Sequence, residues 1–203
     1  MRYEFLYKNN SQNLILFFGG FGFLPKAYAT LKSNNNVIII YDYSKFNLDF
    51  LNECKNYQNI ILLSYSMGAM VASKCDFSNF NIIQKIAING TSYGIHKEFG
   101  INERIFKLSA LNFNLDDFLK KAGANNLKDY FASENTLKNE LLNILEISKM
   151  PIIWQNYDLA YSSNEDAIFP QKALINCFNN IIFMDKPHFC FNNFNSWEEI
   201  CMM

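Results

Sequence analysis

The sequence has no marked excess of charge of either sign and no long apolar run. It contains 18 Lys and Arg residues against 19 Asp and Glu residues, for a formal net charge of −1. This balance argues against a general nucleic-acid binder, because binding to phosphates needs a basic face. A membrane-spanning helix needs roughly 18 consecutive apolar residues, and no run in the chain approaches that length. We therefore expect neither a nucleic-acid partner nor a membrane partner.

Cysteines are few and scattered. A disulfide framework usually shows an even number of cysteines, and a zinc site shows closely spaced pairs. The chain has an odd number and no C-x-x-C spacing: Cys54, Cys75, Cys177, Cys190 and Cys201. The amino terminus carries Glu4 and no long apolar stretch, so we expect no secretory signal. These features predict a protein of the reducing cytoplasm with no bound metal.

The chain is rich in core-forming residues, with 50% hydrophobic and 16% aromatic side chains, enough for one substantial domain. Most of its strand-like runs are continuously apolar, as in a sheet covered on both faces. These runs are residues 2–7, 13–18, 37–42, 59–63, 85–88, 157–162 and 180–184. The short link at 8–11 predicts a hairpin, whereas longer intervals predict crossovers, with loops or single-turn helices at 44–58 and 75–84. The pattern is typical of an α/β fold with a largely parallel sheet.

One pentapeptide predicts chemistry rather than packing. Ser64-Tyr65-Ser66-Met67-Gly68 follows the apolar run 59–63 and precedes a helix-like segment. Strand, sharp turn and helix around a small-x-Ser-x-Gly sequence form the nucleophile elbow of serine hydrolases. The usual first residue is glycine, so Ser64 is a departure, and a helix N-cap serine is the simpler alternative. The context favours Ser66 as a nucleophile.

A serine nucleophile needs a base, and the chain has two histidines, His96 and His188. His188 follows the last predicted strand, where a general base belongs in this chain order. His96 is expected to be a solvated loop residue.

The base needs an orienting acid, and a polar turn after the penultimate strand supplies candidates. Asp166 gives the order Ser, Asp, His along the chain and precedes Ile168-Phe169-Pro170, which would anchor the loop. Glu165 is adjacent and could substitute, and Asp158 lies upstream within the strand. We prefer Asp166 and leave Glu165 open.

Backbone N–H groups must stabilise the oxyanion of an acyl-transfer reaction. Met67, directly after the nucleophile, supplies one. The loop Gly19-Gly20-Phe21-Gly22 follows an early strand, and its glycines let the backbone approach a substrate, so Phe21 is the second expected donor. A phosphate or dinucleotide loop is the rival interpretation, but neither G-x-G-x-x-G nor a Lys-Ser ending is present. We expect no cofactor.

The interval 93–149 interrupts the strand pattern. Leu137, Leu141 and Ile144 fall on one helical face, and segments 105–108 and 115–119 suggest two shorter amphipathic helices. They are either core helices or a lid whose apolar underside forms a substrate pocket. The position between Ser66 and the other two candidate residues favours a lid.

Six motifs are distributed in order along nearly the whole chain. They are Gly19-Gly20-Phe21-Gly22, Tyr41-Asp42-Tyr43, Ser64-Tyr65-Ser66-Met67-Gly68, Ala87-Ile88-Asn89-Gly90-Thr91, Gly100-Ile101 and His188-Phe189-Cys190-Phe191. In order and spacing they resemble the BioG family of pimeloyl-[acyl-carrier-protein] methyl esterases. The resemblance implies an α/β-hydrolase core over 1–92 and 150–203, about seven mostly parallel strands, flanking helices partly replaced by loops, and a small helical lid over 93–149.

The resemblance also implies a reaction and a partner. The family releases methanol from the methyl ester of pimeloyl-acyl carrier protein during synthesis of the pimeloyl precursor of biotin. Phe21, Tyr65, Met67, Phe106 and Phe118 would surround the acyl chain. An acidic carrier protein would dock on lid cations, although each alone is typical of a solvated helix face; the candidates are Arg104, Lys107, Lys120, Lys121 and Lys128.

Two alternatives remain. A general short-acyl carboxylesterase or thioesterase would use the same three side chains. A non-catalytic binding protein with a hydrolase fold is suggested by Ser64 in place of glycine.

Overall fold

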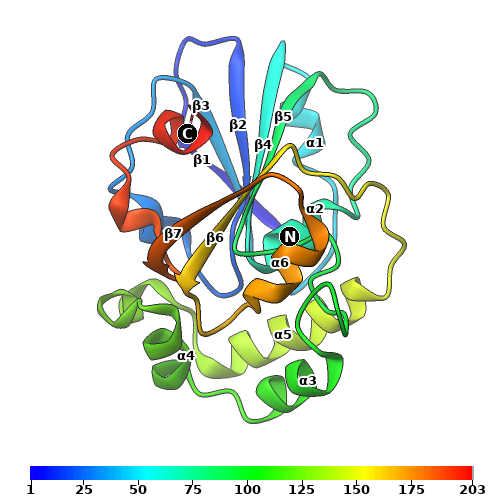
Figure 1. The fold of residues 1–203 in the computed structure, drawn as a ribbon. Coiled ribbons are helices and arrows are strands. Elements are labelled where there is room, and N and C mark those ends of the chain that lie inside the picture. Colours follow the sequence, from blue (N-terminus) through cyan, green and yellow to red (C-terminus); the bar gives the residue numbers. More distant parts are fainter. Residues whose placement is uncertain (203) are drawn as a thin grey trace.

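The computed structural model describes residues 1–202 and has one central sheet with helices around it (Figure 1). The strand order across the sheet is β1-β3-β2-β4-β5-β6-β7. The strands are β1 (Arg2–Tyr7), β2 (Asn13–Phe18), β3 (Asn36–Tyr41), β4 (Asn59–Tyr65), β5 (Ile82–Ile88), β6 (Leu159–Glu165) and β7 (Ile181–Pro187). All seven predicted strands are present, with ends displaced by up to three residues.

Neighbouring residues of a central strand face opposite sides of the sheet. In β2, the Phe17 ring packs against Trp197, and the Phe18 ring packs against Phe50 on the other face. Both phenylalanines are fully buried. Covering on both faces explains why the strand reads as a continuous apolar run rather than an alternating one.

The expected hairpin between the first two strands is wrong. β1 pairs antiparallel with β3, with Arg2 opposite Tyr41, whereas β2 lies between β3 and β4 and is parallel to both. The link is held by the start of β3 and by the loop before it: Asn9 N–H donates to Asn36 Oδ1 at 2.8 Å, and the Asn9 amide donates to Ser33 O. These bonds carry the link past β2 instead of closing a two-strand turn.

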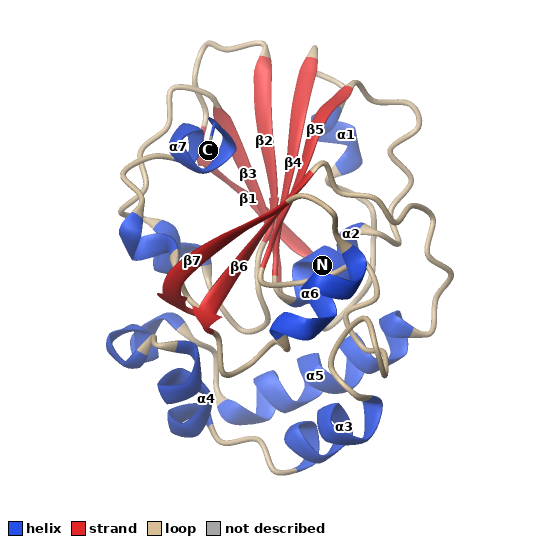
Figure 2. Ribbon diagram, in the orientation of Figure 1, coloured by secondary structure: helices blue, strands red, loops and turns tan. Residues whose placement is uncertain are grey.

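The described residues also form seven α-helices and three short 3₁₀ helices, of which the last two along the chain follow the last strand (Figure 2). The helices are α1 (Leu51–Cys54), α2 (Met67–Ala72), α3 (Glu103–Leu111), α4 (Leu115–Ala122), α5 (Glu134–Ser148), α6 (Gln171–Cys177) and α7 (Trp197–Met202), with η1 (Pro25–Tyr28), η2 (Asn125–Tyr130) and η3 (Phe191–Asn193). As predicted, interval 44–58 holds only the single-turn α1, and 75–81 is turns and loop. Among the helices of residues 1–202, none combines the length and apolarity needed to cross a membrane.

Helices α3 to α5 form one segment between β5 and β6, here called the helical segment. It lies at the end of the sheet where the parallel strands finish, at the bottom of Figure 1. Each of its three α-helices begins at a polar N-cap, Asn102, Asn114 or Ser133, whose side chain accepts a backbone hydrogen bond. Gly123 ends α4 in the left-handed conformation, with φ 68°. Polar N-caps therefore set where each α-helix facing the candidate site begins, and Gly123 sets where α4 ends.

Candidate active site

Ser66 occupies the turn between β4 and α2. Its φ of 54° and ψ of −124° lie outside the favoured regions for a residue with a side chain, as expected at a strained elbow. Gly68 permits the turn, because a Cβ there would lie 2.4 Å from the carbonyl oxygens of both Phe18 and Gly19. The elbow thus brings the start of α2 against the end of β2.

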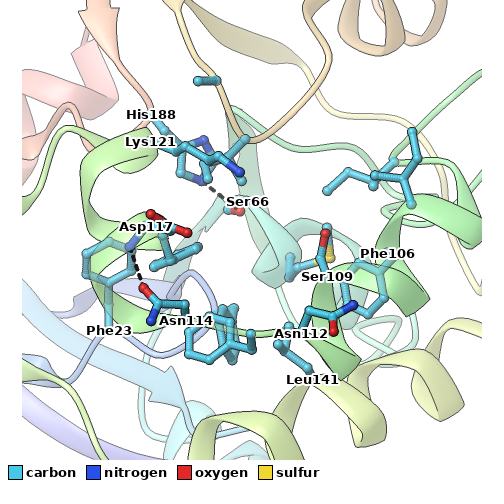
Figure 3. Close-up of a pocket in the computed structure, with 18 residues that line it drawn as sticks. Phe23, Ser66, Phe106, Ser109, Asn112, Asn114, Asp117, Lys121, Leu141 and His188 are labelled. Atoms are coloured by element: carbon cyan, nitrogen blue, oxygen red, sulfur yellow. Dashed lines mark hydrogen bonds between the residues drawn. The ribbon is translucent and has the colours of Figure 1, made fainter. Parts of the chain in front are cut away.

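The side chains of Ser66, His188 and Asp166 lie in hydrogen-bond contact. His188 Nε2 is 3.0 Å from Ser66 Oγ (Figure 3), and His188 Nδ1 is 2.7 Å from Asp166 Oδ2. The His188 and Asp166 side chains are 1% and 3% exposed. With Nδ1–H donating to the carboxylate, Nε2 is free to accept the serine proton.

The acid that contacts His188 is Asp166, whose other oxygen is held by the backbone. Asp166 Oδ1 accepts hydrogen bonds from Ile168 N–H at 2.7 Å and Phe169 N–H at 2.8 Å. Glu165 ends β6 with an exposed side chain. Asp158 lies before the other end of β6, where it accepts from Lys85 N–H at 2.7 Å.

The two expected oxyanion donors both border the cavity beside Ser66. Phe21 and Met67 are among its lining residues. Within the described part of the chain, neither backbone N–H has a hydrogen-bond partner. Being unpaired is one condition for this role, because an oxyanion donor must bond to the ligand oxygen instead.

The cavity has a volume of about 260 Å³ and lies between the sheet end and the helical segment. Its apolar wall includes Phe106, Phe113, Phe118 and Leu141, and its polar wall includes Ser109, Asn112, Asn114, Asp117 and Lys121. Figure 3 shows Ser66 and His188 at one side, with labelled side chains of α3, α4 and α5 around the space. An apolar ligand with a few polar groups fits such a lining.

Tyr65 does not belong to the described lining of this cavity, contrary to its expected role in substrate binding. Its fully buried ring lies 5.0 Å from the His188 ring and 5.0 Å from the Phe191 ring, between centroids. It directly precedes Ser66, so the sharp turn sends the two side chains in different directions. Phe21, Phe106 and Phe118 do line the cavity.

The five cations of the helical segment that were expected to dock a carrier protein are all exposed: Arg104, Lys107, Lys120, Lys121 and Lys128. Lys107 pairs with Glu103 at 2.6 Å on the same helix. Lys128 pairs with Asp116, also at 2.6 Å. Of these five, Lys121 is the one that borders the cavity.

Asn89 is a structural support that the sequence did not reveal. It follows β5 with φ 48° and is buried. Its amide donates to His188 O at 2.9 Å and to Ser163 Oγ at 2.8 Å, while its carbonyl accepts from Ser163 N–H. Asn89 therefore fixes the backbone of His188 to β6. An asparagine in a glycine-containing turn directly after a strand was the available signal.

His96 lies outside the cavity lining, in a turn after β5. Its Nδ1 accepts from the N–H groups of Glu98 and Phe99, both at 3.1 Å, and its ring stacks on Phe99. The expectation of a solvated residue is wrong in part, because this stacking leaves His96 half-buried.

Ser64, the unusual first residue of the elbow motif, is fully buried. Ala87 is its partner on β5, and the hydroxyls of Ser64 and Tyr157 lie next to one another. Tyr157 also donates to Ala69 O at 3.0 Å. The buried Ser64 hydroxyl has no hydrogen-bond partner within residues 1–202, so this departure from glycine adds an unsatisfied polar group beside the turn.

The surroundings of His188 offer no competing nucleophile among the described cysteines. Burial raises the pKa of the Cys190 thiol to about 12, which keeps it protonated. All five cysteines are free thiols. The described residues also contain no group of three or more His, Cys, Asp or Glu side chains placed to hold a metal ion.

Comparison with known proteins assigns the chain to a family. The sequence model described as pimeloyl-ACP methyl esterase BioG matches residues 1–200. The chain belongs to the BioG family. An uncharacterized protein of Haemophilus influenzae is 34% identical over 116 residues, 56% of this chain and 53% of that protein. A Bacteroides fragilis protein named malonyl-[acyl-carrier protein] O-methyltransferase is 31% identical over 171 residues, 78% of this chain but 35% of that protein. The matches thus span about half and about a third of these relatives.

Solved structures agree on the fold. BioG from Haemophilus influenzae has a TM-score of 0.86 at 26% identity, covering 98% of this chain and 99% of that one. The RedJ thioesterase of Streptomyces coelicolor has a TM-score of 0.58 at 14% identity, covering 95% and 89%; such low identity shows the fold alone. This member of the BioG family has the α/β-hydrolase fold that the sequence predicts.

Proposed function

We propose that the chain is a serine esterase that hydrolyses the methyl ester of pimeloyl-[acyl-carrier protein] in biotin synthesis. The observation that carries the proposal is the hydrogen-bonded series Ser66–His188–Asp166 beside an apolar cavity, in a chain of the BioG family. The free thiols favour the reducing cytoplasm as its compartment.

Acylation begins when Ser66 Oγ attacks the ester carbonyl carbon. His188 Nε2 takes the serine proton, and Asp166 holds the imidazole orientation and stabilises the resulting positive charge. The carbonyl oxygen becomes an oxyanion that accepts hydrogen bonds from the N–H groups of Phe21 and Met67. As the intermediate collapses, methoxide leaves with the proton from His188, which yields methanol and an acyl-serine.

Deacylation follows the same steps with water as the nucleophile. His188 takes a proton from a water molecule, whose oxygen attacks the acyl-serine carbonyl. The new intermediate expels Ser66 Oγ, which recovers its proton from His188. The product is a carboxylate at the end of the pimeloyl chain that remains attached to its carrier.

We further propose that residues 93–149 are a lid over the core formed by 1–92 and 150–203. Phe106 and Phe118 of this lid, with Phe21, would contact the methylene chain, since all three line the cavity. The carrier protein would dock beside Lys121, with Arg104 and Lys120 as additional exposed cations. Lys107 and Lys128 already have acidic partners, so their contribution should be smaller.

The nucleophile is tested by methanol release from pimeloyl-[acyl-carrier protein] methyl ester. Ser66→Ala should lower turnover by about a million-fold if Ser66 acts as a triad nucleophile. His96→Ala is the matched histidine control and should retain activity, because His96 lies outside the cavity lining. Absence of fluorophosphonate labelling in the wild type, or labelling that persists in Ser66→Ala, would remove Ser66 from this role.

The substrate is tested by comparing the carrier-bound ester with free dimethyl pimelate. The proposal expects a higher kcat/KM for the carrier-bound ester and growth without biotin when the chain is expressed in a strain lacking its own esterase for this step. Equal kcat/KM values would instead indicate a general short-acyl esterase.

A further inference from the structure

Glu140 of α5 is a buried carboxylate without a cationic partner among the described residues. Its side chain is 3% exposed, and it accepts hydrogen bonds from the N–H of Tyr43, at 3.2 Å, and from the N–H of Gly22. Burial raises its pKa to about 7, although the N–H groups of Tyr43 and Gly22 favour its charged form. Nearby titratable groups are Asp42 and Tyr43, both in the turn after β3. Burying a carboxylate without a cationic partner lowers the free energy of unfolding, so its hydrogen-bond partners indicate what this residue does.

Tyr43 connects Glu140 to the loop of residues 19–22, here called the glycine loop. The Tyr43 hydroxyl donates to Gly19 O at 2.6 Å. A second residue of α5, Asn143, donates its side-chain amide to Tyr43 O. The fully buried Tyr43 is therefore held by α5 through its backbone and holds the glycine loop through its side chain.

Helix α5 also contacts the other end of the glycine loop directly. Gly22 has φ +77°, and a Cβ at this position would come within 3.0 Å of side-chain atoms of Leu137 and Phe131. The loop is thus fixed at Gly19 through Tyr43 and enclosed at Gly22 by the helical segment. Phe21, whose N–H is unpaired among the described residues, lies between these two points.

We propose that Glu140 is a positioning residue that acts through Tyr43 to hold the glycine loop with Phe21 N–H directed at the substrate oxygen. The helical segment then contributes to oxyanion stabilisation as well as to the cavity wall. This inference rests on the proposed function, because it assigns Phe21 N–H to the oxyanion of an acyl transfer.

The first test uses p-nitrophenyl acetate, which is too small to need the lid cavity. Glu140→Leu should lower kcat by roughly ten- to a hundred-fold with little change in KM, less than the 10²–10³-fold loss seen when an oxyanion donor is removed. Glu140→Gln keeps an oxygen acceptor for Tyr43 N–H and should recover most of the loss. Glu146→Gln, an exposed glutamate on the same helix, should match the wild type.

The second test asks whether Glu140 and Tyr43 act through the same loop. Tyr43→Phe removes the hydrogen bond to Gly19 O. In the double variant Glu140→Leu with Tyr43→Phe, the fold reduction in kcat should be smaller than the product of the fold reductions of the two single variants. If Glu140→Leu does not fold, the same cycle is run with Glu140→Ala, which also removes the acceptor for Tyr43 N–H. Multiplicative losses, or a change confined to KM, would overturn the inference.

Fluorophosphonate labelling separates this inference from the proposed function. No labelling of wild-type Ser66 would reject the serine-esterase mechanism itself. Labelling of the wild type together with an equal labelling rate in folded Glu140→Leu would reject the positioning role alone. A slower rate in the variant, with an unchanged circular dichroism spectrum, supports it.

Discussion

At the scale of single residues, the candidate site is built from polar groups that the backbone holds in place. Ser66 is held in a sparsely populated conformation, and Asp166 accepts two backbone N–H groups on the oxygen that does not face His188. Asn89 fixes the carbonyl of His188. Each of these restraints orders a side chain before a substrate arrives, which is how hydrolases reduce the reorganisation needed during reaction.

Replacing Asp166 with asparagine tests the orientation of His188. Asp166→Asn should lower kcat on the order of 10⁴-fold, because an amide at this position favours the wrong imidazole tautomer. Glu165→Gln provides the adjacent exposed control and should stay within about two-fold of the wild type, a small change typical of surface substitutions. Steady-state methanol release measures both, and a larger loss in Glu165→Gln would reverse the assignment.

Tyr65 gives a second prediction, on stability. Its buried hydroxyl has no hydrogen-bond partner among the described residues. Tyr65→Phe removes that unpaired group and keeps the ring, so the free energy of unfolding should rise by about 1 kcal/mol with kcat unchanged. Urea unfolding and ester hydrolysis measure the two quantities. A marked rise in KM would show that Tyr65 contacts the substrate after all.

Single residues differed in how far they could be predicted. His188 could be predicted from the sequence because the chain has two histidines, one of which follows the last strand. The role of Asn89 could not be predicted, because its partners Ser163 and His188 lie more than 70 positions away in the sequence. A pattern of neighbouring residues does not indicate such long-range hydrogen bonds.

At the scale of elements, the site depends on the close approach of α2 and the end of β2. Gly68 makes this approach possible, since the backbone of Phe18 and Gly19 occupies the space that a side chain would need. The same contact brings the glycine loop beside Ser66. Packing of these two elements therefore sets the distance between Ser66 and Phe21, the proposed nucleophile and the proposed oxyanion donor.

Gly68→Ala should disturb both elements. The added Cβ would lie 2.4 Å from two carbonyl oxygens, so either α2 or the loop must shift. We expect a loss of unfolding free energy of about 1–3 kcal/mol, typical of overpacking, and reduced kcat. Gly19→Ala is the matched variant: its nearest contact would be 3.4 Å, so its stability loss should be smaller. Equal losses in thermal unfolding would contradict this steric account.

Strand positions followed directly from apolar runs, but the pairing of β1 did not. The run 2–7 was correct, whereas its partner was β3 rather than β2. Run length and hydrophobicity report burial, and pairing also depends on how the intervening polar residues bond. Asn9 bonds to Asn36, the first residue of β3, and this bond could not be inferred from a strand pattern.

At the scale of the whole molecule, the helical segment contacts both loops of the site. Through α5 it holds the glycine loop, and through the end of α4 it contacts the loop that carries His188. Phe189 N–H donates to Ala122 O at 2.8 Å, and a Cβ on Gly123 would lie 2.4 Å from the Pro187 side chain. Sequence periodicity located these helices, but their contacts with the two loops depend on tertiary packing that periodicity does not encode.

Glu140 makes global stability depend on pH. Its folded pKa of about 7 lies above the ordinary 4.5, so between these values the folded protein retains a proton that the unfolded chain has released. The associated stabilisation is complete below pH 4.5 and is lost as pH rises through 7, a total of about 3 kcal/mol. Glu140→Gln should remove this dependence. Urea unfolding of both proteins from pH 4.5 to 8 measures the free energy of unfolding. If the wild type and Glu140→Gln differ in this free energy by the same amount at every pH, Glu140 does not titrate in this range.

The position of the helical segment in the chain has a consequence for folding order. β5 and β6 are neighbours in the sheet, yet residues 89–158 separate them in sequence. Closing so long a loop is slow relative to local pairing, so β1 to β5 can assemble while β6 and β7 are still unpaired. His188 and Asp166 belong to the late-joining part, and Ser66 to the early one. The nascent chain would then present Ser66 well before it acquires His188 and Asp166, the residues proposed to activate it.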